Sequence, residues 1–236
     1  HIHFTDAEVN LNLPYSKNLL RLIANSGLPK AGLNLYGHFQ LKPFDEEYAK
    51  LLSNAGFVGV NFSTDHTDEY VLRIMNKNHT RENVTRITSY CQDYGIKVMH
   101  ELLFGYPGDN KEKMKSAIDF MTDLDPYVTG ICIGIGVLPG TKLHTYCQRE
   151  QNGLYTSGEP FLDPTFFVDP SFGNGYEELS RTFDDLQKYV GSDSYKFMVP
   201  TMVSTARQNN QTAGSDRIKE QIKQGKFGAG WFHYRE

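Results

Sequence analysis

Apolar runs alternate with amphipathic stretches along the chain as far as Thr141. The short β-branched and aromatic runs predict strands, and apolar residues spaced three and four positions apart predict helices. Strands that alternate with helices at this spacing indicate right-handed crossovers and a parallel sheet. The pattern therefore predicts an α/β fold with a barrel-like core. The predicted strands are residues 1–4, 32–37, 57–62, 96–104 and 129–138, and the predicted helices are 16–26, 45–54, 67–76, 80–94 and 110–123.

The pattern changes after Thr141. Residues 151–175 are rich in glycine, proline and aromatic residues, and they predict an irregular but packed loop. Residues 176–190 predict an amphipathic helix, and Ser215 is a candidate N-cap for another at 215–223. We therefore expect a barrel region at 1–145 and, at 146–236, a C-terminal extension that caps the substrate side. The apolar stripe expected for the first of these helices is Leu179, Phe183, Leu186 and Tyr189.

Local signals add two details to this prediction. Ser16 is the expected N-cap of the first helix. His1 to Phe4 has the composition of a buried strand, so we expect the visible chain to begin inside a core pattern. The aromatic segment 155–172 hints at an apolar ligand, although aromatic runs more often belong to a core.

Composition excludes several classes of protein. The 236 residues are 39% hydrophobic and 22% charged, with a net charge of −4, as in a globular protein without the basic excess of a nucleic-acid binder. No apolar run has the length of a membrane span, so no membrane partner is expected. Three widely separated cysteines predict reduced thiols in a cytoplasmic protein and lack the spacing of a metal site.

Polar and turn-forming segments follow the predicted strands in a fixed order. In a parallel α/β domain, the carboxyl ends of the strands are where ligands bind. Four such segments in series predict a polar ligand over the mouth of a barrel. They are residues 4–10 (Phe-Thr-Asp-Ala-Glu-Val-Asn), 65–66 (Asp-His) with 71–77 (Val-Leu-Arg-Ile-Met-Asn-Lys), 104–109 (Phe-Gly-Tyr-Pro-Gly-Asp) and 138–141 (Leu-Pro-Gly-Thr).

In this order, the four segments resemble the strand-end motifs of the radical S-adenosylmethionine (SAM) enzymes. The resemblance covers about residues 1–145 and is closest to the branch that carries an N-terminal cobalamin-binding domain. It implies a partial parallel (β/α)6 TIM-like barrel, with strands two to six present here and an irregular and helical C-terminal extension. The implied chemistry is reductive cleavage of SAM to a 5′-deoxyadenosyl radical that abstracts hydrogen, with methyl transfer to carbon where cobalamin is bound.

The resemblance also implies roles for individual residues. Asp6, Glu8 and Asn10 would lie where the family binds the methionyl amine, which suits a carboxylate because a charge-assisted hydrogen bond is strong. Asp65 would contact the ribose hydroxyls and Lys77 the methionyl carboxylate. The turn of Gly105, Pro107 and Gly108 would pack beneath the adenine, and the backbone of Val137, Leu138 and Pro139 would contact its edge.

Each of these residues also has an ordinary structural role that the sequence leaves open. A carboxylate after a strand can cap a helix, an asparagine can stabilise a turn, and a lysine can lie solvated at a helix C-terminus. The family usually has Glu-Ser where this chain has Asp65 and His66, so the role of His66 is open. His100 and Glu101 should point to opposite faces of their strand, and we consider His100, with His66, a candidate catalytic residue on the substrate side.

The family's Cys-x-x-x-Cys-x-x-Cys loop, which holds a [4Fe-4S] cluster, does not occur in the sequence. We therefore expect the first strand, the cluster ligands and any cobalamin domain upstream of His1, and no metal ligand within these residues. The expected partners are a small-molecule or peptide substrate and a reductant such as flavodoxin or ferredoxin.

Two other functions remain open at this point. One is an ordinary TIM-barrel-like enzyme that uses Asp65, His100 and Glu101 for acid/base chemistry without iron. The other is a degenerate barrel that binds a partner or a small molecule without catalysis.

Overall fold

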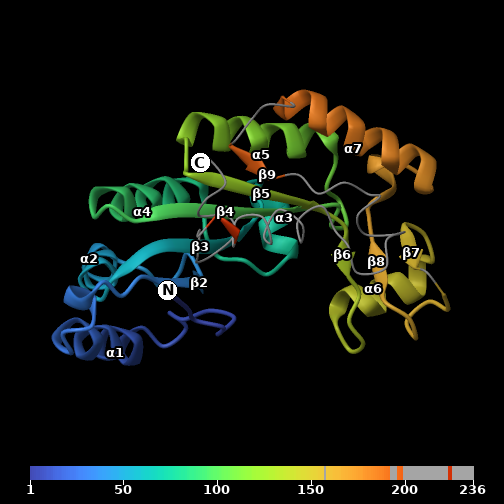
Figure 1. The fold of residues 1–236 in the computed structure, drawn as a ribbon. Coiled ribbons are helices and arrows are strands. Elements are labelled where there is room, and N and C mark those ends of the chain that lie inside the picture. Colours follow the sequence, from blue (N-terminus) through green and yellow to red (C-terminus); the bar gives the residue numbers. More distant parts are fainter. Residues whose placement is uncertain (157, 192–195, 199–222, 225–236) are drawn as a thin grey trace.

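A six-stranded parallel sheet forms the centre of the protein (Figure 1). The computed structural model describes residues 1–156, 158–191, 196–198 and 223–224. Its strands pair side by side in the order β1-β2-β3-β4-β5-β9, and each pairing is parallel. The strands are β1 Ile2–His3, β2 Leu35–Phe39, β3 Phe57–Asp65, β4 Lys97–Phe104, β5 Val128–Ile133 and β9 Phe197–Met198. The predicted α/β class and partial barrel are confirmed, whereas β9 had no sequence signal.

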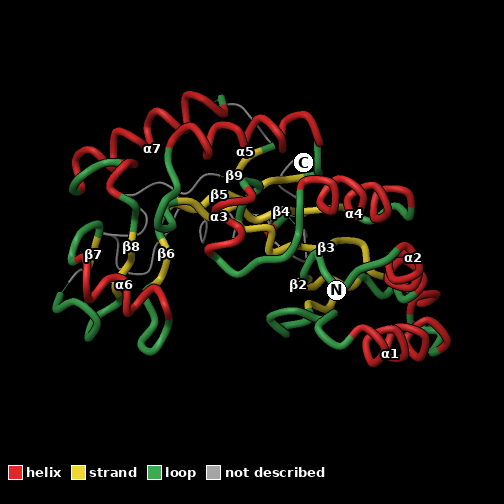
Figure 2. The backbone as a smooth tube through the Cα atoms, turned by 180° about the vertical axis from the view of Figure 1, so that it is seen from behind, coloured by secondary structure: helices red, strands yellow, loops and turns green. Residues whose placement is uncertain are grey.

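The helices cover one face of this sheet (Figure 2). Their buried side chains form one hydrophobic core with strand residues such as Phe39, Phe62 and Phe104. Amphipathic helices bury their apolar stripe in this way because the opposite side is solvated. No helix in the described part of the chain has the length and hydrophobicity that crossing a bilayer requires. The helices that supply the core are α1 Leu13–Asn25, α2 Glu46–Asn54, α4 Arg81–Asp93, α5 Lys111–Leu124 and α7 Tyr176–Val190; the short elements are η1 Pro29–Ala31 and α3 Glu69–Ile74.

Alternation along β4 separates the two faces of the sheet. Val98, Leu102 and Phe104 belong to the core beneath the helices. Met99, between them, packs instead with Tyr36 and Val128 in a smaller cluster. Side chains on a strand alternate between faces, so this smaller cluster marks the face opposite the helices. We call it the open face, a name that denotes only the side away from the helices, since Tyr36, Met99 and Val128 are themselves buried.

A second sheet follows the first and corrects two predictions. The strand expected at 129–138 is interrupted at Gly134, whose φ of 111° suits glycine, and the chain then enters a three-stranded antiparallel sheet. The segment 151–175, expected to be irregular, supplies two strands of this sheet. The elements of this region are β6 Ile135–Gly136, α6 Lys142–Glu150, β7 Leu154–Thr156, β8 Thr165–Phe167 and η2 Pro170–Phe172.

Other local predictions also change. The N-cap of α1 is Asn12, whose side chain accepts from Tyr15, and Ser16 is buried against the hydroxyl of Tyr48. Strand β1 is exposed, not buried. Helix α7 has the predicted bounds, but Tyr189 is 45% exposed. The helix predicted at 215–223 lies outside the described residues except for its last position.

Candidate functional site

An ion pair marks the carboxyl end of β3. Nζ of Lys77 lies 2.5 Å from Oδ2 of Asp65, and both side chains are partly buried. Asp65 has a φ of 56°, and the register between β3 and β4 shifts between Phe62 and Asp65. Aspartate tolerates this left-handed conformation, and a shift of this kind redirects a side chain at the end of a strand. The structure thus brings together two residues that were predicted separately.

The end of α3 aims Lys77 back toward the strand. Asn76 has a φ of 59°, its N–H donates to the carbonyl of Arg73, and the N–H of Lys77 donates to the carbonyl of Leu72. These two bonds form a Schellman motif, which ends the helix and reverses the chain. Lys77 is therefore paired beyond the helix end and is not a solvated lysine of its last turn.

Glu8 joins this pair from the loop after β1. Burial raises the pKa of Glu8, the positive charge of Lys77 lowers it, and the negative charge of Asp65 raises it further, so the net direction is upward. The side-chain amide of Gln40 donates to Oε2 of Glu8. Two carboxylates and one ammonium from three segments therefore lie within electrostatic range of one another. We call Glu8, Asp65 and Lys77 the charged triad.

Asn10 holds the loop that carries Glu8 but has little capacity for a ligand. Its Nδ2 donates to the carbonyls of Gln40 and Pro43 at 2.7 Å each, and its Oδ1 accepts from the N–H of Gln40 at 2.9 Å. It is fully buried. Asp6, by contrast, is exposed in the loop after β1. The turn chemistry that the sequence left open for Asn10 is what the structure shows.

The glycine turn after β4 is organised by Asp109. Gly105 has a φ of 94° and Gly108 a φ of 81°, conformations that disfavour any side chain, and Pro107 lies half-buried between them. Oδ2 of Asp109 accepts from the N–H of Gly105 at 2.8 Å, and its Oδ1 accepts from the N–H of Asn110 at 2.7 Å. Asp109 is buried, so these bonds fix the turn from within.

The segment after β8 holds the same turn from outside. The N–H of Asp169 donates to the carbonyl of Gly105 at 2.8 Å, and Oδ2 of Asp169 accepts from the N–H of Gly108 at 2.9 Å. Ser171 Oγ donates to the carbonyl of Asp109 at 2.9 Å. The turn is therefore clamped between the parallel sheet and the C-terminal extension.

His66 occupies a buried structural position beside the charged triad. Its Nδ1 accepts from the N–H groups of Thr67 and Asp68, and its ring packs edge-on against Phe104. Nε2 lies 3.3 Å from Oδ1 of Asp109 without hydrogen-bond geometry. His66 is fully buried, so its position suits a link between the loop after β3 and the glycine turn better than contact with a substrate.

The expected substrate-side position of His100 is not what the structure shows. His100 lies under the helices, with Nδ1 2.7 Å from Thr64 Oγ1 and Nε2 2.8 Å from Thr88 Oγ1 on α4. Burial, followed by the charge of His79, lowers its pKa to about 3, so the ring is neutral. Glu101 lies on the opposite face, where it accepts from Asn61. An acid/base set of Asp65, His100 and Glu101 is therefore not assembled.

The predicted backbone edge at 137–139 is partly occupied. The N–H of Val137 donates to the carbonyl of Thr165 at 2.8 Å, within the small sheet. The carbonyl of Leu138 accepts from the hydroxyl of Thr141 at 2.7 Å. Val137 is buried, whereas Leu138 and Pro139 are exposed. The Val137 N–H and the Leu138 carbonyl are thus already bonded within the protein. A planar ligand here would mainly contact the exposed side chain of Leu138.

The cysteines do not form a metal centre. Cys91 and Cys147 are buried and Cys132 is exposed. Burial raises the pKa of Cys91, and it raises that of Cys147 to about 11, so neither is a ready thiolate. The described residues contain no group of three or more His, Cys, Asp or Glu that could hold a metal ion. These side chains do not fit a [4Fe-4S] cluster.

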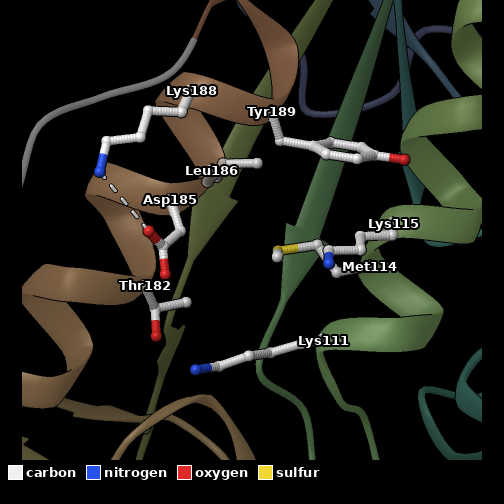
Figure 3. A pocket seen from close by; sticks show the side chains of 8 residues that line it. All are labelled: Lys111, Met114, Lys115, Thr182, Asp185, Leu186, Lys188 and Tyr189. Atoms are coloured by element: carbon white, nitrogen blue, oxygen red, sulfur yellow. Dashed lines mark ion pairs between the residues drawn. The ribbon is translucent and has the colours of Figure 1, made fainter.

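A groove on the helical side is separate from the charged triad. It lies between α5 and α7 and has a volume of about 370 Å³ (Figure 3). Lys188 forms a 3.8 Å ion pair with Asp185 there. None of the strand-end residues lines it. Its lining is Lys111, Met114, Lys115, Thr182, Asp185, Leu186, Lys188 and Tyr189.

Sequence reasoning missed several residues that build the site. Asp109 stood in the glycine-turn motif, where a carboxylate after Pro-Gly was the available signal. Gln40 and Asp169 carried none, because they act through loops whose approach depends on the whole fold. Their contacts to Glu8 and Gly108 link segments that are far apart in the sequence.

Comparison with known proteins places this geometry in a family. The model of the radical SAM superfamily matches residues 1–121, slightly more than half of the chain. Across its whole length, the chain is 29% identical to a tryptophan 2-C-methyltransferase of Streptomyces laurentii, of which it covers 48%. It is 22% identical, over 61% of its length, to an uncharacterized methyltransferase of Pyrococcus horikoshii, of which it covers 31%.

Solved structures give the same family. The radical SAM methyltransferase TsrM from Kitasatospora setae, with cobalamin and a [4Fe-4S] cluster bound, matches 99% of the chain with a TM-score of 0.84 and 27% identity. A structure of TsrM with tryptophan and a SAM analogue matches with a TM-score of 0.83. The chain covers 50% and 51% of these two, so it spans about half the length of its relatives. The matched residues, the parallel sheet and its strand-end loops together show that the chain belongs to the radical SAM superfamily.

Proposed function

We propose that the protein containing this chain is a radical SAM methyltransferase, and that the charged triad positions SAM. The observation that carries the proposal is the convergence of Glu8, Asp65 and Lys77 at the carboxyl end of the sheet. SAM carries an ammonium, a carboxylate and a ribose diol, and the triad offers two carboxylates and an ammonium. The strand ends of a parallel sheet are where such ligands bind.

Each member of the triad has a separate task in this proposal. Glu8 accepts from the methionyl ammonium, Lys77 pairs with the methionyl carboxylate, and Asp65 accepts from the ribose hydroxyls. Lys77 is already paired with Asp65 at 2.5 Å. When SAM binds, Lys77 therefore exchanges Asp65 for the methionyl carboxylate, and Asp65 exchanges Lys77 for the ribose hydroxyls. The ionised triad carries one net negative charge. SAM carries a sulfonium, an ammonium and a carboxylate, so its one net positive charge offsets that of the triad when it binds.

The glycine turn, with Gly105, Pro107 and Gly108, supplies a surface of backbone beneath the adenine in the same proposal. The two glycines allow close packing of the turn, because a Cβ on Gly105 would lie 3.1 Å from Val168 Cγ1 and one on Gly108 would lie 2.8 Å from Tyr70 Cε1. Asp109 and Asp169 keep the turn rigid, so the surface is formed before the ligand arrives. Leu138, exposed in the loop between β6 and α6, offers an apolar contact on the other side.

A SAM molecule bound here would supply either the methyl group or the precursor of the adenosyl radical, so a reaction that uses both consumes two molecules of SAM. The chain's own contribution is to bind and orient SAM. The described residues provide no fit for a [4Fe-4S] cluster, and no step through the cluster is assigned to them. The cluster, cobalamin and a reductant such as flavodoxin or ferredoxin belong to the proposal for the complete protein, by analogy with TsrM, whose structure contains the first two.

The proposed substrate is a small aromatic amino acid of the tryptophan type. TsrM binds tryptophan, and the relative from Streptomyces laurentii is a tryptophan 2-C-methyltransferase. Both are 27–29% identical to this chain over almost all of its length. Sequence identity at this level supports a substrate of the same chemical class as tryptophan.

Calorimetry with Asp65→Ala tests the cofactor assignment. The variant should bind SAM more weakly by about 1 to 3 kcal/mol, the range of a charge-assisted hydrogen bond. Asp93→Ala, on the exposed end of α4, is the matched control and should bind SAM as the parent protein does. Unchanged affinity in Asp65→Ala would remove the ribose assignment.

The reaction itself is tested with the complete gene product, reconstituted with iron and sulfide without oxygen. We expect transfer of a labelled methyl group from SAM to an aromatic amino acid, detected by mass spectrometry. A complete coding sequence without a three-cysteine loop, or a reconstituted protein that leaves SAM intact under reducing conditions, would refute the proposal.

A further inference from the structure

The open face of the sheet carries a row of polar side chains that the charged triad does not use. His38 on β2, Asn61 on β3 and Glu101 on β4 lie on neighbouring strands, and His38 and Asn61 are direct register partners. Nδ2 of Asn61 donates to Oε1 of Glu101 at 2.9 Å and lies 3.2 Å from Nδ1 of His38. We call these three residues the polar row.

Asn61 has an acceptor that the described residues leave unused. The side chain is 2% exposed, and its Oδ1 has no hydrogen-bond partner in the described part of the chain. The amide orientation is fixed, because Nδ2 must face the carboxylate of Glu101 and Oδ1 would be repelled by it. A buried acceptor without a partner is costly, so its retention on an otherwise ordered strand indicates a ligand that donates to it.

Glu101 gives the polar row one negative charge. It is half-buried, and the described residues provide no Lys, Arg or His that forms an ion pair with it. Burial and the proximity of His38 lower the pKa of His3, which favours a neutral ring. The charge of Glu101 is therefore not cancelled locally.

We propose that the polar row binds the protonated primary amine of the substrate, with Asn61 Oδ1 and Glu101 as acceptors. This inference rests on the proposed function and names the chemical class of the substrate group recognised by the open face. An ammonium fits because it carries one positive charge and three donors, whereas the row offers one negative charge and open acceptors. A metal ion fits less well, since the described residues form no cluster of three ligating side chains.

Binding of two related ligands to the complete protein tests the amine assignment. Tryptophan carries the amine, and 3-(indol-3-yl)propionate has the same ring and carboxylate without it. Glu101→Gln should weaken tryptophan binding about 10- to 100-fold, the effect of losing a charge-assisted hydrogen bond, and should leave indolepropionate binding unchanged. Glu82→Gln, on the exposed side of α4, is the matched control and should alter neither.

A second variant separates recognition from folding. Asn61→Leu removes the unused acceptor, and we expect it to weaken tryptophan more than indolepropionate while SAM affinity and circular dichroism stay as in the parent protein. Equal losses for the two indole ligands, or no loss for either in Glu101→Gln, would overturn the amine site. If the amine site is overturned but SAM still binds, the proposed cofactor site is not contradicted. If the parent protein does not bind SAM at all, the proposed function itself is refuted.

Discussion

At the scale of single residues, backbone conformation decides what a charged side chain can do. Asp65 and Asn76 both lie in the left-handed region, one at a strand end and the other just after a helix. These two turns bring Lys77 to Asp65. The sequence identified both charged residues through their order in the motif. It could not predict the pairing, because a left-handed turn at an aspartate depends on the register of the neighbouring strand.

His100 illustrates the opposite case at the same scale. A histidine inside a strand has two faces available, and the sequence alone cannot say which one the helices cover. The structure places it between Thr64 and Thr88, which satisfy both ring nitrogens of the neutral form. A residue expected to take part in catalysis is therefore part of the core.

Acidification should destabilise the protein through His100. Its pKa is about 3 in the folded protein against an ordinary value of 6.5, so the unfolded chain binds the proton first and stability falls as the pH drops below 6.5. Between pH 6.5 and 5.5 this contributes a loss of about 1 kcal/mol in the free energy of unfolding. Urea denaturation of the parent protein and His100→Gln at both pH values measures it. An equal pH dependence in the two proteins would contradict the assignment.

At the scale of elements, periodicity predicted the helices and the parallel strands well. Helix α7 has the expected bounds, and β4 begins one residue after the predicted start. The prediction was wrong for the strand expected at 129–138, where a continuous apolar run favours one strand and a glycine within it favours a break. The apolar run at 129–138 contains Gly134, and the structure breaks there because the chain must leave one sheet for another. Strands of two or three residues, such as β7 and β8, are too short to show an alternating pattern.

Gly108 and Gly95 provide a matched pair of substitutions at this scale. Both have positive φ, so alanine at either position should cost about 1 to 2 kcal/mol of stability. A Cβ on Gly108 would lie 2.8 Å from Tyr70 Cε1, whereas nothing lies within 4 Å of one on Gly95. Gly108→Ala should therefore also weaken SAM binding in calorimetry, and Gly95→Ala should not. Equal cofactor affinity in both variants would argue against a role for the turn.

At the scale of the whole molecule, the two faces of the sheet have different tasks. The helical face holds the hydrophobic core, and the open face carries the polar row beside a small apolar cluster. The family resemblance predicted a barrel mouth with ligands above it. It did not predict that the segment after β8 returns to clamp the glycine turn, because that contact joins residues about 60 positions apart, Gly108 and Asp169.

Hydrogen exchange should register this connection. SAM binding at the charged triad and the glycine turn should slow exchange in residues 165–172 as well, because Asp169 and Ser171 bond directly to the turn. Asp169→Asn leaves one oxygen for two N–H donors, Gly108 and Ser171, and should reduce the remote protection. Asp123→Asn, exposed on α5, is the control. Protection confined to residues 65–77 and 105–109 would contradict the connection.

The clamp on the glycine turn has a consequence for how this protein tolerates change. Coupling between two sites is reciprocal, so whatever ligand binding contributes to ordering the extension, a well-ordered extension contributes equally to ligand affinity. Substitutions near Asp169 that touch no ligand should then alter cofactor affinity. Redesign of the substrate side would have to preserve the Asp169 contacts to the glycine turn. A change that altered substrate selectivity but broke these contacts would otherwise lower the occupancy of the cofactor site.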